Sequence, residues 1–279
     1  MTGPTVIRRT AELLGAHREF VLAHLVSVTG SVPQQVGAKM IVFADRTTEF
    51  TIGGGPFEAK VTEAAAALLR SGAGPELKEY TLSQGDLGMY CAGKATVLLE
   101  VFRPDWRLLV FGGGHVGRAL ARMAVETGVF ETWVIDDRAE FAAPAAHPTA
   151  AAVVHTDREY RRGVPEPDAR TLVVIVTRCH EVDRRLLGRF ARISGPEAAL
   201  PYVGMIGSRA KVTRMRAELA AEGLPAAALD RVHMPIGLPV GGKNPGEIAV
   251  SILAQLLQVK QALVERAEQT GETPSRAAP

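Results

Sequence analysis

The stretch RLLVFGGGHVGRALARMAVETGVFETWVIDD, residues 107–137, decides the fold of the second half of the chain. An apolar run of strand length, 108–111, leads through a glycine-rich turn into a helix-forming segment. A second β-rich run, 133–135, ends in two aspartates. This is the order of parts in a dinucleotide-binding βαβ unit, so we expect a Rossmann-like domain with a doubly wound parallel sheet.

Each glycine of this turn has its own expected role. Gly112 permits the tight turn, Gly114 lets a pyrophosphate approach the backbone, and Gly117 lets the helix pack closely on the strand. The amino terminus of the helix offers free N–H groups and a partial positive charge to phosphates. The turn therefore predicts a nucleotide site, although a glycine-rich turn that only closes a strand onto a helix is the alternative interpretation.

The acidic end of the second strand indicates how a nucleotide would be held. Asp136 lies 24 positions after Gly112, near the usual distance for a carboxylate that takes the ribose hydroxyls, and Asp137 is a second candidate. Arg138 could instead meet a 2′-phosphate. The cofactor-binding residues expected in this motif are Gly112, Gly114, His115, Gly117 and Asp136.

Length and composition exclude several classes of protein. The 279 residues, 47% of them hydrophobic, suffice for two ordinary domains with buried cores. A net charge of +2 gives no basic field of the kind that nucleic-acid binders use, so we expect no nucleic-acid partner. Two cysteines suggest no disulfide framework, and the amino terminus lacks the apolar core of a signal peptide. No stretch approaches the roughly 18 to 20 uninterrupted apolar residues of a membrane span, so we expect a cytoplasmic protein with no membrane partner.

The first hundred residues have no dinucleotide-binding pattern, and we expect an α+β domain there. Residues 5–17 form a plausible amphipathic helix, and 20–29 reads as a strand. The segments 38–44 and 48–52, joined by a polar turn, predict a hairpin. The whole chain is therefore expected to be α/β in class, with an α+β domain followed by the Rossmann-like domain.

Three consecutive glycines follow the predicted hairpin. Gly53, Gly54 and Gly55 precede an alanine-rich helix that reaches about Arg70, and their backbone N–H groups could form an anion-binding nest. The alternative is a tight turn with Pro56 at the first helical position.

Cys91 lies on a loop at the entrance to a predicted strand, 95–102. Its neighbours are small, and nearby Lys94 could favour the thiolate form of the sulfur. A soft thiolate in such a place suits a soft metal or a cofactor, whereas a buried small hydrophobe is the alternative interpretation.

The second half of the chain continues to alternate strands and helices. Further strands are expected at 150–154, 171–176 and 202–206. The loops after the last two should face the same crevice as the glycine turn, because open parallel sheets bind ligands at carboxyl strand ends. Gly207, Ser208 and Arg209 offer an oxyanion or phosphate pocket, with a solvated basic helix start as the alternative. His180 and Asp183 could orient one another, but a helix-start histidine with an exposed aspartate is equally compatible.

The expected domain boundaries follow from these patterns. A cofactor-binding domain covers 1–103, the Rossmann-like domain covers 104–265, and a polar tail at 266–279 is expected to be disordered. The last helix of the second domain begins with a capping box at Asn244 and carries an apolar stripe that packs on the sheet.

Several longer motifs follow one another along the chain. In the first half they are VSVTGSVP at 26–33, GAKM at 37–40 and IGGG at 52–55 with Glu58. In the second half they are FGGGHVGRALA at 111–121, the 177–183 loop, YVGMIGSR at 202–209 and HMPIGLPVGGKNPGEIAVSI at 233–252. In this order they resemble the XdhC/CoxI family, the accessory factors of xanthine dehydrogenase and related molybdenum hydroxylases. The resemblance extends from about residue 19 to residue 257.

The resemblance implies a molybdenum-cofactor chaperone rather than an enzyme. Members of the family bind molybdopterin, shield it while a cysteine desulfurase exchanges an oxo ligand for a sulfido ligand, and pass it to the apo-hydroxylase. Cys91 matches the cysteine of the family's CGG motif and is the expected cofactor and metal ligand. Gly53, Gly54 and Gly55 would cradle the pterin phosphate, and Glu58 would shape that pocket. A homodimer could protect the cargo at its interface.

The chain departs from the family pattern at three positions. Ala92 stands where the motif has its first glycine, and Pro56 stands where some members carry a second cysteine. These two changes put a two-cysteine metal site in doubt. Arg178 replaces a histidine, which weakens a metal or acid/base role for the loop that contains it.

Two other functions remain open. A Rossmann domain can hold NAD, NADP, a pterin nucleotide or nothing, so an NAD(P)-dependent oxidoreductase is one alternative, with His180 as the candidate proton donor. The other is a scaffold that pairs desulfurase and hydroxylase without holding the cofactor itself.

Overall fold

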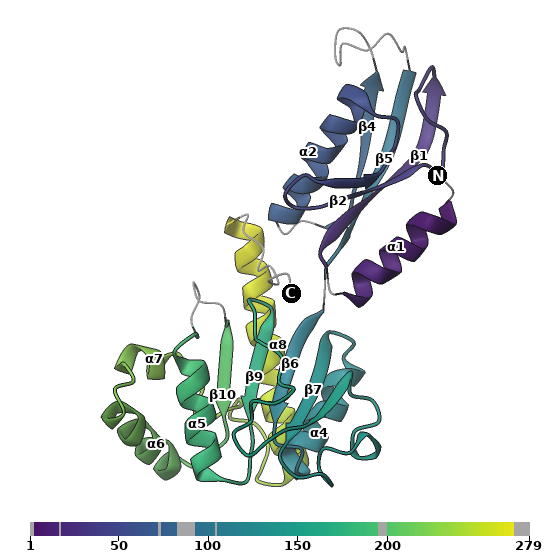
Figure 1. Ribbon diagram of the computed structural model, residues 1–279. Helices are drawn as coiled ribbons and strands as arrows, with labels where there is room; N and C mark the ends of the chain where they lie inside the picture. Colours follow the sequence, from purple (N-terminus) through teal and green to yellow (C-terminus); the bar gives the residue numbers. More distant parts are fainter. Residues whose placement is uncertain are drawn as a thin grey trace. The chain divides into compact units, whose positions relative to one another are not determined.

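The computed structural model describes residues 3–16, 18–71, 74–82, 93–103, 105–194 and 200–270 (Figure 1). The chain divides into two compact units, a first unit of residues 1–104 with 263–279 and a second unit of residues 105–262. Each unit has its own five-stranded sheet and its own hydrophobic core.

The first unit is an α+β unit with an antiparallel sheet in the order β3-β2-β1-β5-β4. Its strands are β1 (Phe20–Gly30), β2 (Lys39–Val42), β3 (Thr48–Phe50), β4 (Glu76–Leu82) and β5 (Gly93–Phe102), and its helices are α1 (Gly3–Gly15) and α2 (Gly55–Ser71). The predicted hairpin is the β2–β3 pair, which joins Met40 to Phe50.

The two helices of the first unit cover opposite faces of its sheet. Successive residues of a strand point to opposite sides, and β1 has apolar residues on both. Val21 belongs to the buried cluster that contains Phe57 of α2, whereas Phe20 belongs to the cluster that contains Val6 of α1. The long run of apolar residues in β1 therefore indicates a central strand buried on both faces.

The second unit has the Rossmann arrangement. Its sheet has the order β10-β9-β6-β7-β8, and every pair of neighbouring strands is parallel. The strands are β6 (Trp106–Phe111), β7 (Phe130–Asp136), β8 (Ala152–His155), β9 (Thr171–Ile175) and β10 (Tyr202–Met205). Numbered along the chain, this is the order 5-4-1-2-3 of a doubly wound sheet, so the strand order reverses between β6 and β9.

Helices cover this parallel sheet on both sides. They are α4 (His115–Glu126), α5 (His180–Ala191), α6 (Arg209–Ala221), α7 (Ala226–Asp230) and α8 (Pro245–Thr270), with a 3-10 turn, η1 (Pro144–Ala146). Leu109 and Phe111 of β6 pack in one cluster with residues of α5 and α6. The alternate residues Leu108 and Val110 are also completely buried. Burial on both faces explains why the strands are continuous apolar runs.

The predicted fold class is confirmed, since an α+β unit precedes a Rossmann-like unit with a doubly wound parallel sheet. The last helix is longer than predicted, because α8 reaches Thr270 rather than residue 265. Its segment Pro245–Arg266 is the single helix among the described residues that is long and apolar enough to cross a membrane by length and composition alone. Ala249, Ile252 and Leu256 of this helix are completely buried, as in the core helix of a globular unit.

Candidate functional site

The glycine turn after β6 has the geometry expected of a nucleotide-binding turn. Gly112 has φ +112°, and a Cβ there would lie 2.6 Å from the carbonyl oxygen of Val176. A Cβ at Gly117 would overlap the carbonyl oxygen of Gly112, so the helix can approach the strand only because this residue has no side chain. At Gly114 the nearest heavy atom lies 4.0 Å away, on Arg138. The first and third glycines are therefore needed for packing, and the second faces open space.

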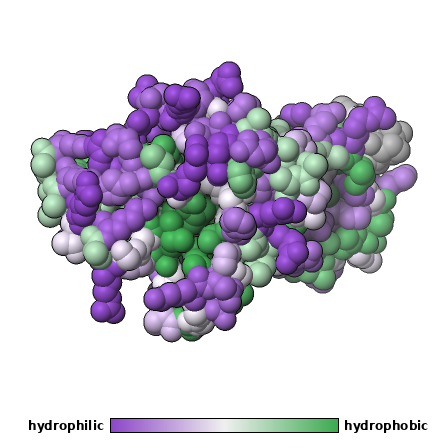
Figure 2. Space-filling view, turned by 90° about the horizontal axis from the view of Figure 1, so that it is seen from below, coloured by the Kyte–Doolittle hydropathy of each residue, from purple (hydrophilic) through white to green (hydrophobic). Residues whose placement is uncertain are grey.

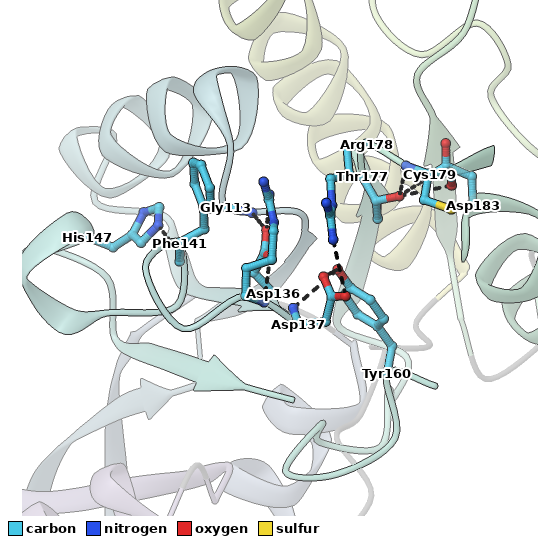
Figure 3. A network of polar contacts seen from close by, with 11 residues as sticks. Gly113, Asp136, Asp137, Phe141, His147, Tyr160, Thr177, Arg178, Cys179 and Asp183 are labelled. Carbon is cyan, nitrogen blue, oxygen red and sulfur yellow. Dashed lines mark hydrogen bonds and ion pairs between the residues drawn. The ribbon is translucent and has the colours of Figure 1, made fainter. Parts of the chain in front are cut away.

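Asp136, the expected ribose ligand, is 1% exposed and is fully engaged within the protein (Figure 3). Its Oδ2 accepts from the N–H of Gly113 at 2.8 Å and from Arg138 Nη2 at 2.9 Å. Its Oδ1 accepts from the N–H and the Nε of Arg138 at 3.0 and 2.9 Å. Burial acts to raise the pKa of Asp136, but the hydrogen bonds from Arg138 and from the two backbone N–H groups outweigh it and hold the pKa below its usual value. This carboxylate therefore fixes the glycine turn and the residues after β7.

Arg138 is held from two sides. One edge of its guanidinium pairs with Asp136, and its Cζ lies 3.7 Å from the centre of the Phe141 ring. The carbonyl oxygen of Phe141 accepts from His147 Nε2 at 2.9 Å. Burial is the main cause that lowers the pKa of His147, which is 5% exposed. The segment after β7 thus folds back onto the glycine turn.

A crevice of about 680 Å³ opens at the carboxyl ends of the strands. Its lining includes Asp137, Tyr160, Thr177, Arg178, Cys179 and His180. Asp137 accepts a hydrogen bond of 3.0 Å from the Tyr160 hydroxyl and lies 3.7 Å from Arg178 Nη2 (Figure 3). Burial, with the nearby Asp136 and Asp137 charges, raises the pKa of the Tyr160 hydroxyl. The second candidate for ribose recognition therefore faces a cavity, whereas the first does not.

The loops after β9 and β10 are joined by a buried polar network. Asp183 is completely buried and accepts from the Thr177 hydroxyl and from Lys211 Nζ, each at 2.5 Å. Burial raises the pKa of Asp183 despite these partners. His180 instead pairs with Glu218 of α6 at 2.8 Å. The expectation that His180 and Asp183 orient one another is wrong, and so is the expectation of an exposed Asp183.

The loop after β10 lies at the same edge of the sheet. Ser208 caps α6, and its hydroxyl accepts from the Lys211 N–H at 3.2 Å. Ser208 and Arg209 are exposed, and Gly207 is partly buried. An anion-binding role for Gly207, Ser208 and Arg209 stays a prediction.

Apolar surface is available at this edge as well. The parallel strands of the second unit run downward in Figure 1 from the start of β6, so the view from below in Figure 2 faces their carboxyl ends. Figure 2 shows hydrophobic residues gathered in a central area with hydrophilic residues around it. Ligand pockets commonly combine an apolar lining with a few polar groups.

The glycine turn of the first unit is held by Glu58. Gly53, Gly54 and Gly55 have φ values of +134°, +73° and +63°. One oxygen of Glu58, Oε2, accepts from the Thr51 hydroxyl at 2.5 Å and from the N–H groups of residues 52 and 54 at 3.1 and 3.0 Å. The carboxylate thus occupies part of the N–H surface that the sequence predicted for an anion. A Cβ at Gly54 or Gly55 would meet no heavy atom within 4 Å, so a ligand has room to approach the backbone there.

Three segments meet beside this turn. A Cβ at Gly53 would lie 2.6 Å from Pro33 Cγ, which belongs to the turn after β1. A Cβ at Gly93, the first residue of β5, would lie 2.6 Å from the carbonyl oxygens of both Thr29 and Ser31. Cys91, the expected cofactor ligand, lies outside the described residues. Among the residues that are described, no group of three or more His, Cys, Asp or Glu side chains could hold a metal ion.

Sequence reasoning missed two contacts of the crevice. Tyr160 belongs to no motif, and it reaches Asp137 only because its backbone adopts φ +54° in the loop after β8. The stacking of Arg138 on Phe141 depends on the turn after β7. No local signal identifies either contact, because both join residues through a loop conformation.

Comparison with known proteins identifies the family. A family model described as the XdhC Rossmann domain matches residues 108–256, and one described as the XdhC and CoxI family matches residues 13–81. The chain belongs to the XdhC and CoxI family, as its motifs indicated.

Several curated relatives are similar to this chain. Uncharacterized protein YqeB of Escherichia coli (strain K12) is 30% identical over 258 residues, which cover 91% of this chain and 46% of YqeB. A probable xanthine dehydrogenase component of Bacillus subtilis (strain 168) is 25% identical over 165 residues, 59% of this chain and 46% of that protein. The chain thus spans about half the length of these two relatives.

A third relative matches along most of its length. The molybdenum cofactor insertion chaperone PaoD of Escherichia coli (strain K12) is 23% identical over 308 residues, which cover 92% of this chain and 88% of PaoD. Among solved structures, the crystal structure of a xanthine dehydrogenase from Bacillus halodurans has a TM-score of 0.48 and 23% identity, and covers 94% of this chain and 96% of that one.

Proposed function

We propose that this protein is an accessory factor that binds the molybdenum cofactor and delivers it to xanthine dehydrogenase or a related molybdenum hydroxylase. The observation that carries the proposal is membership of the XdhC and CoxI family, with both family regions present in one chain. The similarity to a molybdenum cofactor insertion chaperone along 88% of its length supports the same role. In this account the cofactor is a cargo, and the protein turns over no substrate.

The cargo would bind at the end of the first sheet, where the glycine turn lies. The open space over Gly54 and Gly55 suits a group that approaches the backbone closely, such as the phosphate of molybdopterin. Glu58 would act indirectly, since its carboxylate holds the turn in its left-handed conformation. Cys91, two positions before Gly93 in the sequence, would supply the thiolate ligand, because soft metals favour sulfur.

The chain contains a matched control for this proposal. Its other cysteine, Cys179, lies in the second unit and has no part in the proposed cargo site. After incubation with molybdenum cofactor, we expect the native chain and Cys179→Ala to retain molybdenum and pterin, and Cys91→Ala to lose them. Equal retention by Cys91→Ala would move the site to the glycine turns.

We further propose that a cysteine desulfurase modifies the cofactor while this protein holds it, and that a homodimer protects the cargo. Co-purification with a desulfurase and an apo-hydroxylase, and the molar mass by light scattering, test these two statements. A chain that binds both partners but never retains cofactor would be a scaffold rather than a carrier.

A second candidate function is NAD(P) binding by the Rossmann unit, as an oxidoreductase or as a regulator. The geometry of Gly112, Gly114 and Gly117 favours it, because only the middle glycine faces open space. Gly114→Ala should leave the fold intact and prevent close approach of a pyrophosphate, so it should lose nucleotide binding. A change in NADH absorbance with a candidate substrate would distinguish an enzyme from a binding module. No binding of NAD or NADP by the native chain would rule out this second function.

A further inference from the structure

The carboxylate at the end of β7 has no acceptor capacity left for a ligand. A carboxylate offers about four lone-pair sites, and Asp136 uses all of them on Gly113 and Arg138. The side chain is also 1% exposed. The two hydroxyls of an unmodified ribose, which must donate to an acceptor, therefore meet an acid that is already satisfied.

The group that borders the glycine turn is instead a cation. Asp136 takes two of the five N–H groups of Arg138, at Nε and Nη2. The side chain of Arg138 is 20% exposed, and its Nη2 lies 4.0 Å from the Cβ position of Gly114, where a pyrophosphate would approach. The guanidinium thus faces the path of a nucleotide along the turn.

The position of Arg138 is fixed before any ligand arrives. Its carbonyl oxygen accepts from the N–H groups of Phe141 and Ala142, each at 3.0 Å, which closes a turn beneath the side chain. The ring of Phe141 supports one face of the guanidinium, and the Phe141 carbonyl is held by His147. A preorganised cation loses little conformational entropy when it binds an anion.

We propose that Arg138 is a specificity-determining residue that makes the crevice select adenine dinucleotides with a 2′-phosphate, the NADP class, over those with a free 2′-hydroxyl. The inference rests on the second candidate function, nucleotide binding by the Rossmann unit. The 2′-phosphate carries charge that pairs with the guanidinium, and its oxygens accept hydrogen bonds that a satisfied carboxylate would repel. Asp137, which faces the crevice, is the competing ribose ligand and would favour NAD.

The test measures binding of NADP⁺ and of NAD⁺ to the full chain by isothermal titration calorimetry. These two ligands differ only in the 2′-phosphate. Hydrogen bonds to charged groups predict that native protein binds NADP⁺ roughly tenfold to hundredfold more tightly, and that the preference decreases at high salt. Arg138→Gln should abolish the preference by weakening NADP⁺ binding alone.

Because Arg138→Gln leaves a buried carboxylate with fewer donors, the double variant Asp136→Asn with Arg138→Gln is measured beside it. The double variant buries no charge and should also bind the two ligands equally. Arg216→Ala, which removes an arginine paired with Asp230 on the surface, is the matched control and should keep the preference. Equal binding of NAD⁺ and NADP⁺ by native protein, or a preference that survives in the folded double variant, would overturn the inference. Failure of both ligands to bind would overturn it together with nucleotide binding, while the cofactor assay on Cys91 would still decide the chaperone proposal.

Discussion

Removal of Lys211 should expose the cost of the buried carboxylate behind the crevice. Asp183 is 0% exposed, and Lys211, with a side chain 27% exposed, donates to it at 2.5 Å. Lys211→Met keeps most of the apolar stem and leaves Asp183 with the Thr177 hydroxyl as its side-chain donor. Loss of one partner of a buried pair costs about 3 to 5 kcal/mol, and the partial exposure of Lys211 places the expected loss near the lower figure, about 3 kcal/mol at pH 8.

The loss should depend on pH in a defined direction. Burial already raises the pKa of Asp183, and removal of the lysine raises it further. The folded variant then holds a proton that an unfolded aspartate, with a pKa of about 3.9, has released. The stability of the variant relative to the native chain therefore decreases as the pH rises from about 4 toward the raised pKa. The difference should be smaller at pH 5 than at pH 8.

The chain offers a convenient probe for this measurement. Its two tryptophans, Trp106 and Trp133, both lie in the sheet of the second unit, so urea unfolding followed by tryptophan fluorescence reports that unit. The double variant Asp183→Asn with Lys211→Met should recover much of the loss, because it buries no charge. A loss below about 1 kcal/mol, or one that is equal at pH 5 and pH 8, would refute the reasoning, because it would place the carboxylate in contact with water.

Three further predictions test other parts of the fold. Glu58→Ala should destabilise the first unit by about 2 to 3 kcal/mol and speed amide exchange in its glycine turn, with a smaller effect for Glu58→Gln, which keeps one acceptor; unchanged exchange would contradict the assigned hydrogen bonds. Gly117→Ala should cost about 3 kcal/mol or more in urea unfolding because its methyl would overlap the Gly112 carbonyl oxygen, whereas Gly114→Ala should cost less than about 1 kcal/mol, and equal costs would argue against the close helix contact. Because burial lowers the pKa of His147, stability should fall as the pH drops below about 6.5, the unfolded value, and thermal melts of His147→Gln should show a flatter profile between pH 7 and pH 5; an identical profile would mean that this histidine is not buried.

The fold could be predicted from the sequence because local patterns and global architecture agree. The apolar run before Gly112 and the acidic end at Asp136 predicted the βαβ unit, and the parallel sheet confirms it. The strand order followed from the rules for doubly wound sheets rather than from any residue. The extent of α8 was harder to predict, since its last turn at Thr270 lacks a glycine or proline stop signal.

The site could be predicted only in part, because a motif identifies positions but not contacts. The spacing placed Asp136 at the end of the strand, and the structure agrees. It could not show that Arg138, two residues later, would turn back and saturate the carboxylate. Tyr160 was missed altogether, because its contact with Asp137 depends on a long loop with no sequence signature. Such contacts arise from tertiary packing, which one-dimensional periodicity does not encode.

Cofactor transfer is the most direct test of the central claim. The native chain, Cys91→Ala and Cys179→Ala are each incubated with free molybdenum cofactor, freed from unbound material, analysed for molybdenum and pterin, and mixed with an apo-hydroxylase whose activation is measured. The account predicts near-stoichiometric cofactor and activation for the native chain and Cys179→Ala, and neither for Cys91→Ala. Absence of molybdenum and pterin from the native chain, with no activation of the hydroxylase, would contradict it.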